Sequence, residues 1–156
     1  MKTIQYLKYI FRHKWFVFLE CYRLGIIWRG LMHDMSKFLP SEFFAYREYF
    51  YGNPDIKEIE AFDFAWHWHI RRNKHHWQWW ILKFDNGGLK IFEMPVQYRK
   101  EMIADWIGAG KAIHGKDNLK LWYQENRDKI ALAPETRKWV ENWIEQREIP
   151  KQFAAV

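Results

Sequence analysis

Apolar side chains recur every three or four residues along most of the chain, and few residues interrupt them. In the first segment Ile4, Leu7, Trp15 and Phe18 follow this spacing, which places them on one face of an α-helix. The 156 residues include only 5 prolines and 8 glycines, so long helices fit better than many short strands. The sequence therefore predicts an all-α fold, a compact helical bundle formed by a single domain over residues 1–156.

Residues that start or stop helices set the expected bounds. Gly25 ends the first helix, and Ser41 and Asp55 are good N-caps for two later ones. A strong turn is expected at Asp85-Asn86-Gly87-Gly88. In the helix that starts at Pro95, the side chains of Met102, Trp106 and Ile113 should face inward. The expected helices cover residues 3–24, 26–38, 42–51, 77–84, 95–114, 119–129 and 134–147, and a further one runs from the cap at Asp55 through His69, with a helix end or a kink expected at residues 73–76.

Composition and charge restrict the binding partners and the cellular compartment that we expect for this protein. A net charge of +6 favours anionic partners, such as phosphorylated small molecules or nucleic acid. The single cysteine, Cys21, excludes an internal disulfide framework and favours a reducing compartment. Neither a signal peptide nor a run of about 18 apolar residues is recognisable. We therefore expect a cytoplasmic protein that does not enter a membrane.

Histidines and aspartates form the most informative pattern. Four of the seven histidines fall between residues 67 and 76. His33 and Asp34 stand side by side in an apolar segment, where an aspartate needs a partner because burial of an unpaired charge is costly. His67, which alternates with tryptophans, and His114, near a helix end, are better explained as packing or surface residues. The candidate metal ligands are His13, His33, Asp34, His69, His75, His76 and Asp105.

These ligand types restrict the metal. Imidazole mixed with carboxylate suits Mn, Fe, Ni or Zn better than Ca. Helices in a bundle can point such side chains into one central pocket. The two oxygens of Asp34 can bridge two metals, so we expect one or two divalent transition-metal ions.

The segment Leu31-Met32-His33-Asp34-Met35-Ser36-Lys37-Phe38 resembles the metal-binding segment of the HD-domain phosphohydrolases. That resemblance implies an HD-domain-like fold, in which His13, His33, Asp34 and Asp105 match the minimal ligand set. His69 and His75 or His76 match the additional ligands of two-metal members. The spacing departs from the usual pattern, because His13 precedes His33 by only twenty residues and the gap between His69 and His75 is short.

A second resemblance covers nearly the whole chain. The blocks that carry it are His13-Lys14, Cys21, Gly25, His33-Asp34 through Phe43, Ala65-Trp66 with His69, Asn73 through Trp77, and Met94-Pro95 with Glu101-Met102, Asp105 and Trp106. They are similar to an uncharacterised family of bacterial and bacteriophage proteins, known only as a domain of unknown function. The resemblance implies a bacterial cell, in some cases with a phage-encoded gene, and assigns no activity.

Five further residues are candidates for contact with substrate or ligands. Lys37 lies one helical turn after His33 and can contact a substrate phosphate, or it is a solvated cation at a helix end. Asn73, Lys74 and Arg99 are further candidates for phosphate contact. Glu101 shares a helix face with Asp105, where it either accepts a hydrogen bond from a ligand imidazole or is a surface charge.

We therefore expect a metal-dependent phosphohydrolase or phosphodiesterase that acts on a nucleotide or another small phosphorylated molecule through metal-activated water. A di-iron oxygenase of the HD fold is the first alternative, because the same ligand set supports oxygen chemistry there. A non-catalytic module that binds nucleic acid or protein is the second, and it requires exposed aromatic side chains on which bases stack. Inward-facing Trp66, Trp77 and Trp80 would weaken that alternative.

Overall fold

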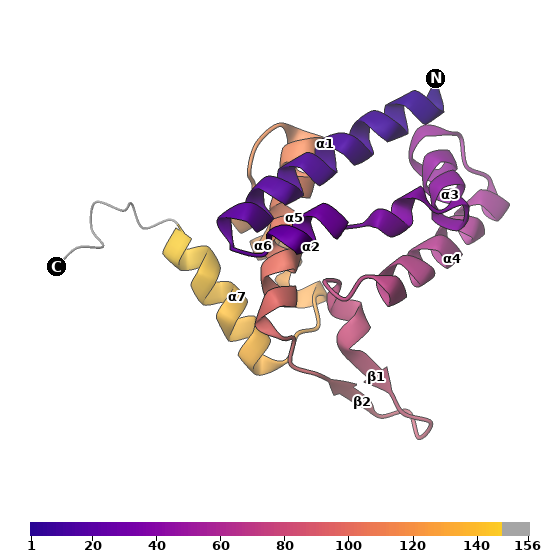
Figure 1. Cartoon of the computed structure of the whole chain (residues 1–156). Helices are drawn as coiled ribbons and strands as arrows, with labels where there is room; N and C mark the ends of the chain where they lie inside the picture. Colours follow the sequence, from indigo (N-terminus) through magenta and orange to yellow (C-terminus); the bar gives the residue numbers. More distant parts are fainter. Residues whose placement is uncertain (148–156) are drawn as a thin grey trace.

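Two long helices cross and form the most extensive contact between any two elements of the structure (Figure 1). They are α1 (Lys2–Arg23) and α5 (Val96–His114) in the computed structural model, which describes residues 1–147. Their contact is close at Gly108, where a Cβ atom would lie 2.4 Å from Cγ2 of Val17. Because Val17 follows His13 by one helical turn and Gly108 follows Asp105 by about one turn, this contact brings His13 and Asp105 together.

Five further α-helices surround this pair in the described residues, and one short hairpin accompanies them (Figure 1). The helices are α2 (Ile27–Met32), α3 (Pro40–Tyr51), α4 (Ile56–Arg72), α6 (Leu119–Asn126) and α7 (Pro134–Arg147). Short 3-10 turns cover Met35–Phe38, Trp77–Trp80 and Arg127–Lys129. The hairpin joins β1 (Ile81–Lys83) and β2 (Leu89–Ile91). The predicted all-α fold is confirmed, since two three-residue strands are the only sheet in the described part of the chain.

Most predicted helix ends agree with the structure. Asp55 caps α4, since its side chain accepts hydrogen bonds from the backbone N–H groups of Lys57 and Glu58. The prediction for Ser41 was wrong, because α3 already begins at Pro40. Proline suits the first position of a helix, where its fixed φ fits and its missing N–H has no intrahelical partner.

The predicted helix over residues 26–38 was wrong in its middle. Helix α2 stops at Met32, and Asp34 adopts a left-handed conformation with φ 53° and ψ 28°. Asp34 is the one residue other than glycine with positive φ among residues 1–147. A 3-10 turn then continues from Met35 to Phe38. The helical run is therefore interrupted at the His33-Asp34 pair, and both side chains are buried.

The predicted helix over residues 77–84 was also wrong. One 3-10 turn is followed by β1, which pairs antiparallel with β2 so that Ile81 faces Ile91. The predicted turn at residues 85–88 is confirmed, and it closes this hairpin with Gly87 at φ +84°. A short apolar run fits a strand as well as a helix. Here the turn allows residues 81–83 to pair with residues 89–91, which stabilises the strand.

Two larger apolar clusters, and a small one of Val17, Cys21 and Ala104, form the core of the described residues. One of the larger clusters contains Ile103 and Ile107 of α5 and packs against α6 and α7, while the other contains Tyr6 and Ile10 of α1 and packs against α3 and α4. Ile113 was predicted to face inward, but 60% of it is exposed. In the described residues, each helix is either too short or too polar to cross a membrane.

Candidate metal centre

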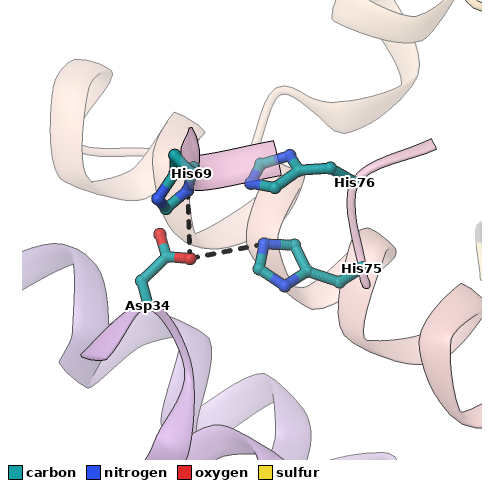
Figure 2. Close-up of side chains that lie close together, drawn as sticks. All are labelled: Asp34, His69, His75 and His76. Carbon is teal, nitrogen blue, oxygen red and sulfur yellow. Dashed lines mark ion pairs between the residues drawn. The ribbon is translucent and has the colours of Figure 1, made fainter. Parts of the chain in front are cut away.

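The seven predicted ligands converge on one buried point between α1, α4 and α5. His13 comes from the middle of α1, Asp105 from α5 and His69 from the last turn of α4. His33 and Asp34 occupy the break after α2, and the loop after α4 supplies His75 and His76 (Figure 2). Five separate segments therefore contribute side chains to a single cluster, which we call the His/Asp cluster.

Asp34 stands at the centre of the His/Asp cluster. Its Oδ2 lies 3.4 Å from Nε2 of His33 and 3.8 Å from Nε2 of His13. Its Oδ1 lies 3.3 Å from Nε2 of His69 and 3.4 Å from Nε2 of His75, as Figure 2 shows. Each carboxylate oxygen thus faces a different pair of imidazole nitrogens.

The described residues contain three groups of potential ligand atoms, one formed by His33, His75 and Glu101, and two that share Asp34. Of the two that share Asp34, one consists of His13, His33, Asp34 and Asp105, and the other of Asp34, His69, His75 and His76. Within each group the ligand atoms lie within 4.8 Å of one another. Asp105 joins the first group closely, with its Oδ1 3.1 Å from Nε2 of His13 and 3.3 Å from Nε2 of His33. Four donors of this type around one point match the usual coordination of a transition metal.

Most of these ligand atoms have no bonding partner outside the cluster. In residues 1–147, Nε2 of all five histidines and Oδ1 of Asp34 are buried without a hydrogen bond, while Oδ2 of Asp34 is paired with the ammonium group of Lys37. His33 and Asp34 are each only 1% exposed. Buried polar atoms without partners are rare in native proteins because each costs free energy. Six such atoms gathered in one place fit a group of metal ligands, and this donor set suits the metals that the sequence suggested.

Glu101 orients two of the imidazole rings. Its Oε1 accepts from Nδ1–H of His33 and from Nδ1–H of His75, each at 3.3 Å, and its Oε2 accepts from Arg29 at 3.0 Å. A proton on Nδ1 leaves the lone pair on Nε2, which is the nitrogen that faces Asp34. Of the two roles considered for Glu101, the structure favours the hydrogen-bond acceptor, since its side chain is only 7% exposed.

Glu42 does the same for His69, and sequence reasoning assigned it no role. Its Oε2 accepts from Nδ1–H of His69 at 2.9 Å and from the Ser36 hydroxyl at 2.8 Å. Arg72 donates to its Oε1 at 2.5 Å. The signal in the sequence was a glutamate among aromatic residues, yet its place in the first turn of a helix also suits an exposed acid.

Charges within the His/Asp cluster stabilise one another. Burial disfavours the charged form of His33, but the carboxylates of Asp34, Asp105 and Glu101 outweigh it and raise the pKa of His33 to about 10. Burial also opposes ionisation of Asp34, yet His33 and Lys37 lower the pKa of Asp34 well below its usual value. The site therefore strongly favours positive charge beside its carboxylates, which a bound cation would also provide.

Three of the four remaining predicted site residues, Lys37, Asn73 and Lys74, lie at or near the cluster. Lys37 is at the cluster, with Nζ 2.7 Å from Oδ2 of Asp34. Asn73 holds residues next to the cluster in place, since its Nδ2 donates to the Ser36 hydroxyl and to the backbone carbonyl of His69. Lys74 lies on the rim of a cavity of about 680 Å³ that also borders His75.

Arg99 does not join them. Its guanidinium donates to the Met94 carbonyl at 2.5 Å and to the Glu93 carboxylate, and it is only 6% exposed. These bonds hold the start of α5 against the preceding loop, so the expected phosphate contact of Arg99 has no support in this geometry. His67 and His114 lie outside the cluster and are exposed, as expected for surface residues.

Comparisons with known proteins add a family and no activity. Neither the curated proteins nor the solved structures include a match to this chain. The model of a family of unknown function, DUF5662, matches residues 2–146, which include every residue of the His/Asp cluster. The chain therefore belongs to DUF5662, a family of unknown function.

Proposed function

We propose that this chain is a metal-dependent phosphohydrolase that acts on a nucleotide or another small phosphorylated molecule. The observation that carries the proposal is the group of five buried histidine Nε2 atoms around Asp34 that lack hydrogen bonds. A carboxylate whose two oxygens face two separate ligand groups suits a pair of divalent ions. The resemblance of the segment around His33-Asp34 to the HD-domain phosphohydrolases supports the same function.

Bound divalent ions would supply the nucleophile, because they lower the pKa of a bound water toward neutrality. The side chains of the protein orient the metal ligands and provide a positive charge for the substrate phosphate. Glu101 and Glu42 hold three imidazole rings with Nε2 directed inward. Lys37 is 12% exposed, and Asp34 outweighs the effect of burial and raises the pKa of Lys37, so it remains an ammonium group beside the cluster. Such a fixed positive charge can hold a phosphate oxygen.

A di-iron oxygenase remains the second candidate, because Asp34 can equally bridge two iron ions. The third candidate, a module that stacks bases on tryptophans, has less support. Trp66, Trp77 and Trp80 each pack against an apolar cluster. Tryptophans that pack inward do not offer an exposed surface on which bases can stack, which argues against a module that binds nucleic acid.

Elemental analysis of the purified chain tests the proposal. We expect Mn, Fe, Ni or Zn in the protein, and loss of that metal in the double variant His33→Ala, Asp34→Ala. The matched control is His67→Ala, His114→Ala, which removes two exposed histidines and should retain the metal. Unchanged metal content in the His33, Asp34 variant would refute the metal centre.

Turnover then separates the two enzymatic candidates. We expect release of phosphate from p-nitrophenyl phosphate or a nucleotide panel in the presence of Mn²⁺ or Ni²⁺. Iron bound in air together with a visible absorption band, and no phosphate release, would favour the oxygenase instead.

A further inference from the structure

A second cavity, of about 550 Å³, lies beside the His/Asp cluster. Seven of its ten lining residues are aromatic, from α1, α3 and α4. Lys37 is its one charged lining residue. Cavities that bind small molecules have this volume and this mixture of apolar rings with few polar groups. We call it the aromatic cavity.

Helix geometry places the aromatic cavity on the ligand-bearing faces of two helices, α1 and α4. Tyr9 lies one turn before His13 on α1, and Trp66 lies three residues before His69 on α4. The Tyr9 ring stacks on His13 at 5.8 Å, and the Trp66 ring stacks on His69 at 5.7 Å. The cavity wall therefore rests directly on candidate metal ligands.

The charged end of the aromatic cavity is at Lys37. Its ammonium group lies 2.7 Å from Oδ2 of Asp34 and 5.9 Å from the centre of the Tyr46 ring. Lys37 thus contacts the cluster and lines the cavity at the same time. A ligand in the cavity that contacts Lys37 therefore lies beside the cluster.

Two tyrosine hydroxyls in the wall of the aromatic cavity have no partner. Tyr6 is 1% exposed and Tyr46 is 5% exposed, and neither hydroxyl forms a hydrogen bond within residues 1–147. Burial is the main cause that raises the pKa of both groups, while the charge of Lys37 opposes it. Both hydroxyls therefore stay protonated and can donate. Leaving them unpaired is costly, which indicates a ligand with acceptor oxygens.

These observations rest on the proposed function and extend it to a substrate class. We propose that the aromatic cavity binds a phosphate monoester carrying one planar ring, such as an aryl phosphate or a nucleoside monophosphate. The phosphate lies near Lys37, where the hydroxyls of Tyr6 and Tyr46 donate to its oxygens, and the ring packs among the aromatic side chains. One lining cation matches a monophosphate better than a triphosphate, which would bury more negative charge than Lys37 offsets.

Binding of phosphonates that cannot be hydrolysed tests this assignment without turnover. We would titrate the Mn²⁺-loaded chain with phenylphosphonate, methylphosphonate and tripolyphosphate by calorimetry. Burial of about 100 Å² of ring surface should make phenylphosphonate bind at least about tenfold more tightly than methylphosphonate. Tripolyphosphate should bind more weakly than phenylphosphonate. Equal affinity for the two phosphonates, or a preference for tripolyphosphate, overturns the proposal.

Removal of one hydroxyl provides a second readout. Tyr46→Phe should weaken the binding of both phosphonates about fivefold to tenfold, since one donor to the anion is lost. It should leave the melting temperature of the ligand-free chain unchanged or higher, because an unpaired buried hydroxyl disappears. Tyr49→Phe, on the same helix and outside the cavity, is the matched control. A lower melting temperature with unchanged phosphonate binding would assign the Tyr46 hydroxyl to the fold and overturn its role.

Failure of the proposed function gives a different result. A chain that binds phenylphosphonate preferentially but holds no metal and releases no phosphate keeps the cavity assignment and loses the phosphohydrolase. A chain that holds metal and releases phosphate but shows no preference for the ring keeps the phosphohydrolase and loses the substrate class.

Discussion

Replacement of Glu101 by glutamine should weaken metal binding without removing a ligand. Glu101 Oε1 accepts from Nδ1–H of both His33 and His75, and Oε2 accepts from Arg29. A glutamine has one oxygen and one NH₂ group. With the oxygen toward the histidines, its NH₂ group faces Arg29, which is 32% exposed and can turn into solvent. With the NH₂ group toward the histidines, both rings must move their proton to Nε2, where it blocks a metal.

The first orientation is the cheaper, so we expect metal binding to survive with lower affinity. Carboxylates that hold metal-binding histidines are typically worth about tenfold to hundredfold in metal affinity. Because Glu101 holds two rings and supplies a negative charge to both, we expect a loss of metal affinity at the upper end of this range, about hundredfold. That factor corresponds to about 2.7 kcal/mol.

Competition with a chelating indicator measures the affinity of Glu101→Gln for Zn²⁺ or Mn²⁺. Glu20→Gln is the matched control, because Glu20 is also a buried glutamate that binds cations, Arg23 and Lys111, but lies outside the cluster. The control should bind metal like the wild type. If Glu101→Gln also binds like the wild type, Glu101 does not set the protonation of the two rings and our reasoning about Nδ1 fails.

Three further predictions address packing, a corrected residue and pH. Gly108→Ala should lower the free energy of unfolding by about 1–3 kcal/mol and weaken metal binding. The Cβ atom of the alanine would lie 2.4 Å from Val17 and push α1 away from α5. Urea unfolding measures the first effect, and competition with a chelating indicator measures the second. Arg99→Met should destabilise the chain by about 1–3 kcal/mol through its lost bonds to Glu93 and Met94, while phosphonate binding stays unchanged in calorimetry. For the metal-free chain, burial raises the pKa of Glu101 but its histidine partners outweigh this and lower it from 4.5 to about 2. The stabilising effect of the ionised Glu101 carboxylate is thus complete above pH 4.5 and is lost as the pH falls toward 2. In urea unfolding, the difference in unfolding free energy between the wild type and Glu101→Gln should therefore shrink by on the order of 3 kcal/mol over this pH range. A difference that stays constant would refute this prediction.

Much of the helical framework was predictable because it depends on local signals. The apolar spacing gave α1 and α5 to within about two residues, and Asp55 marked the start of α4 through its own side chain. The two wrong helices fail for physical reasons that are not local. At residues 26–38, packing of His33 and Asp34 into the interior overrides a helical pattern. At residues 77–84, pairing with residues 89–91 decides for a strand.

The sequence by itself determined the ligand types, since histidine and aspartate are chemically unlike the apolar residues around them and stand out in any register. It also placed His13, His69 and Asp105 on helices, whereas His33 and Asp34 lie in a break that the sequence did not predict. Only the tertiary structure decided that Asp34 lies between two groups of imidazoles, because that depends on the left-handed turn at Asp34 and on the close contact at Gly108. Only the tertiary structure gave Glu42 and Glu101 their hydrogen-bond partners, and only it separated Arg99 from the site. A residue type limits the chemistry that a side chain can do, whereas the partners of a buried side chain come from segments distant in sequence, which the local pattern does not encode.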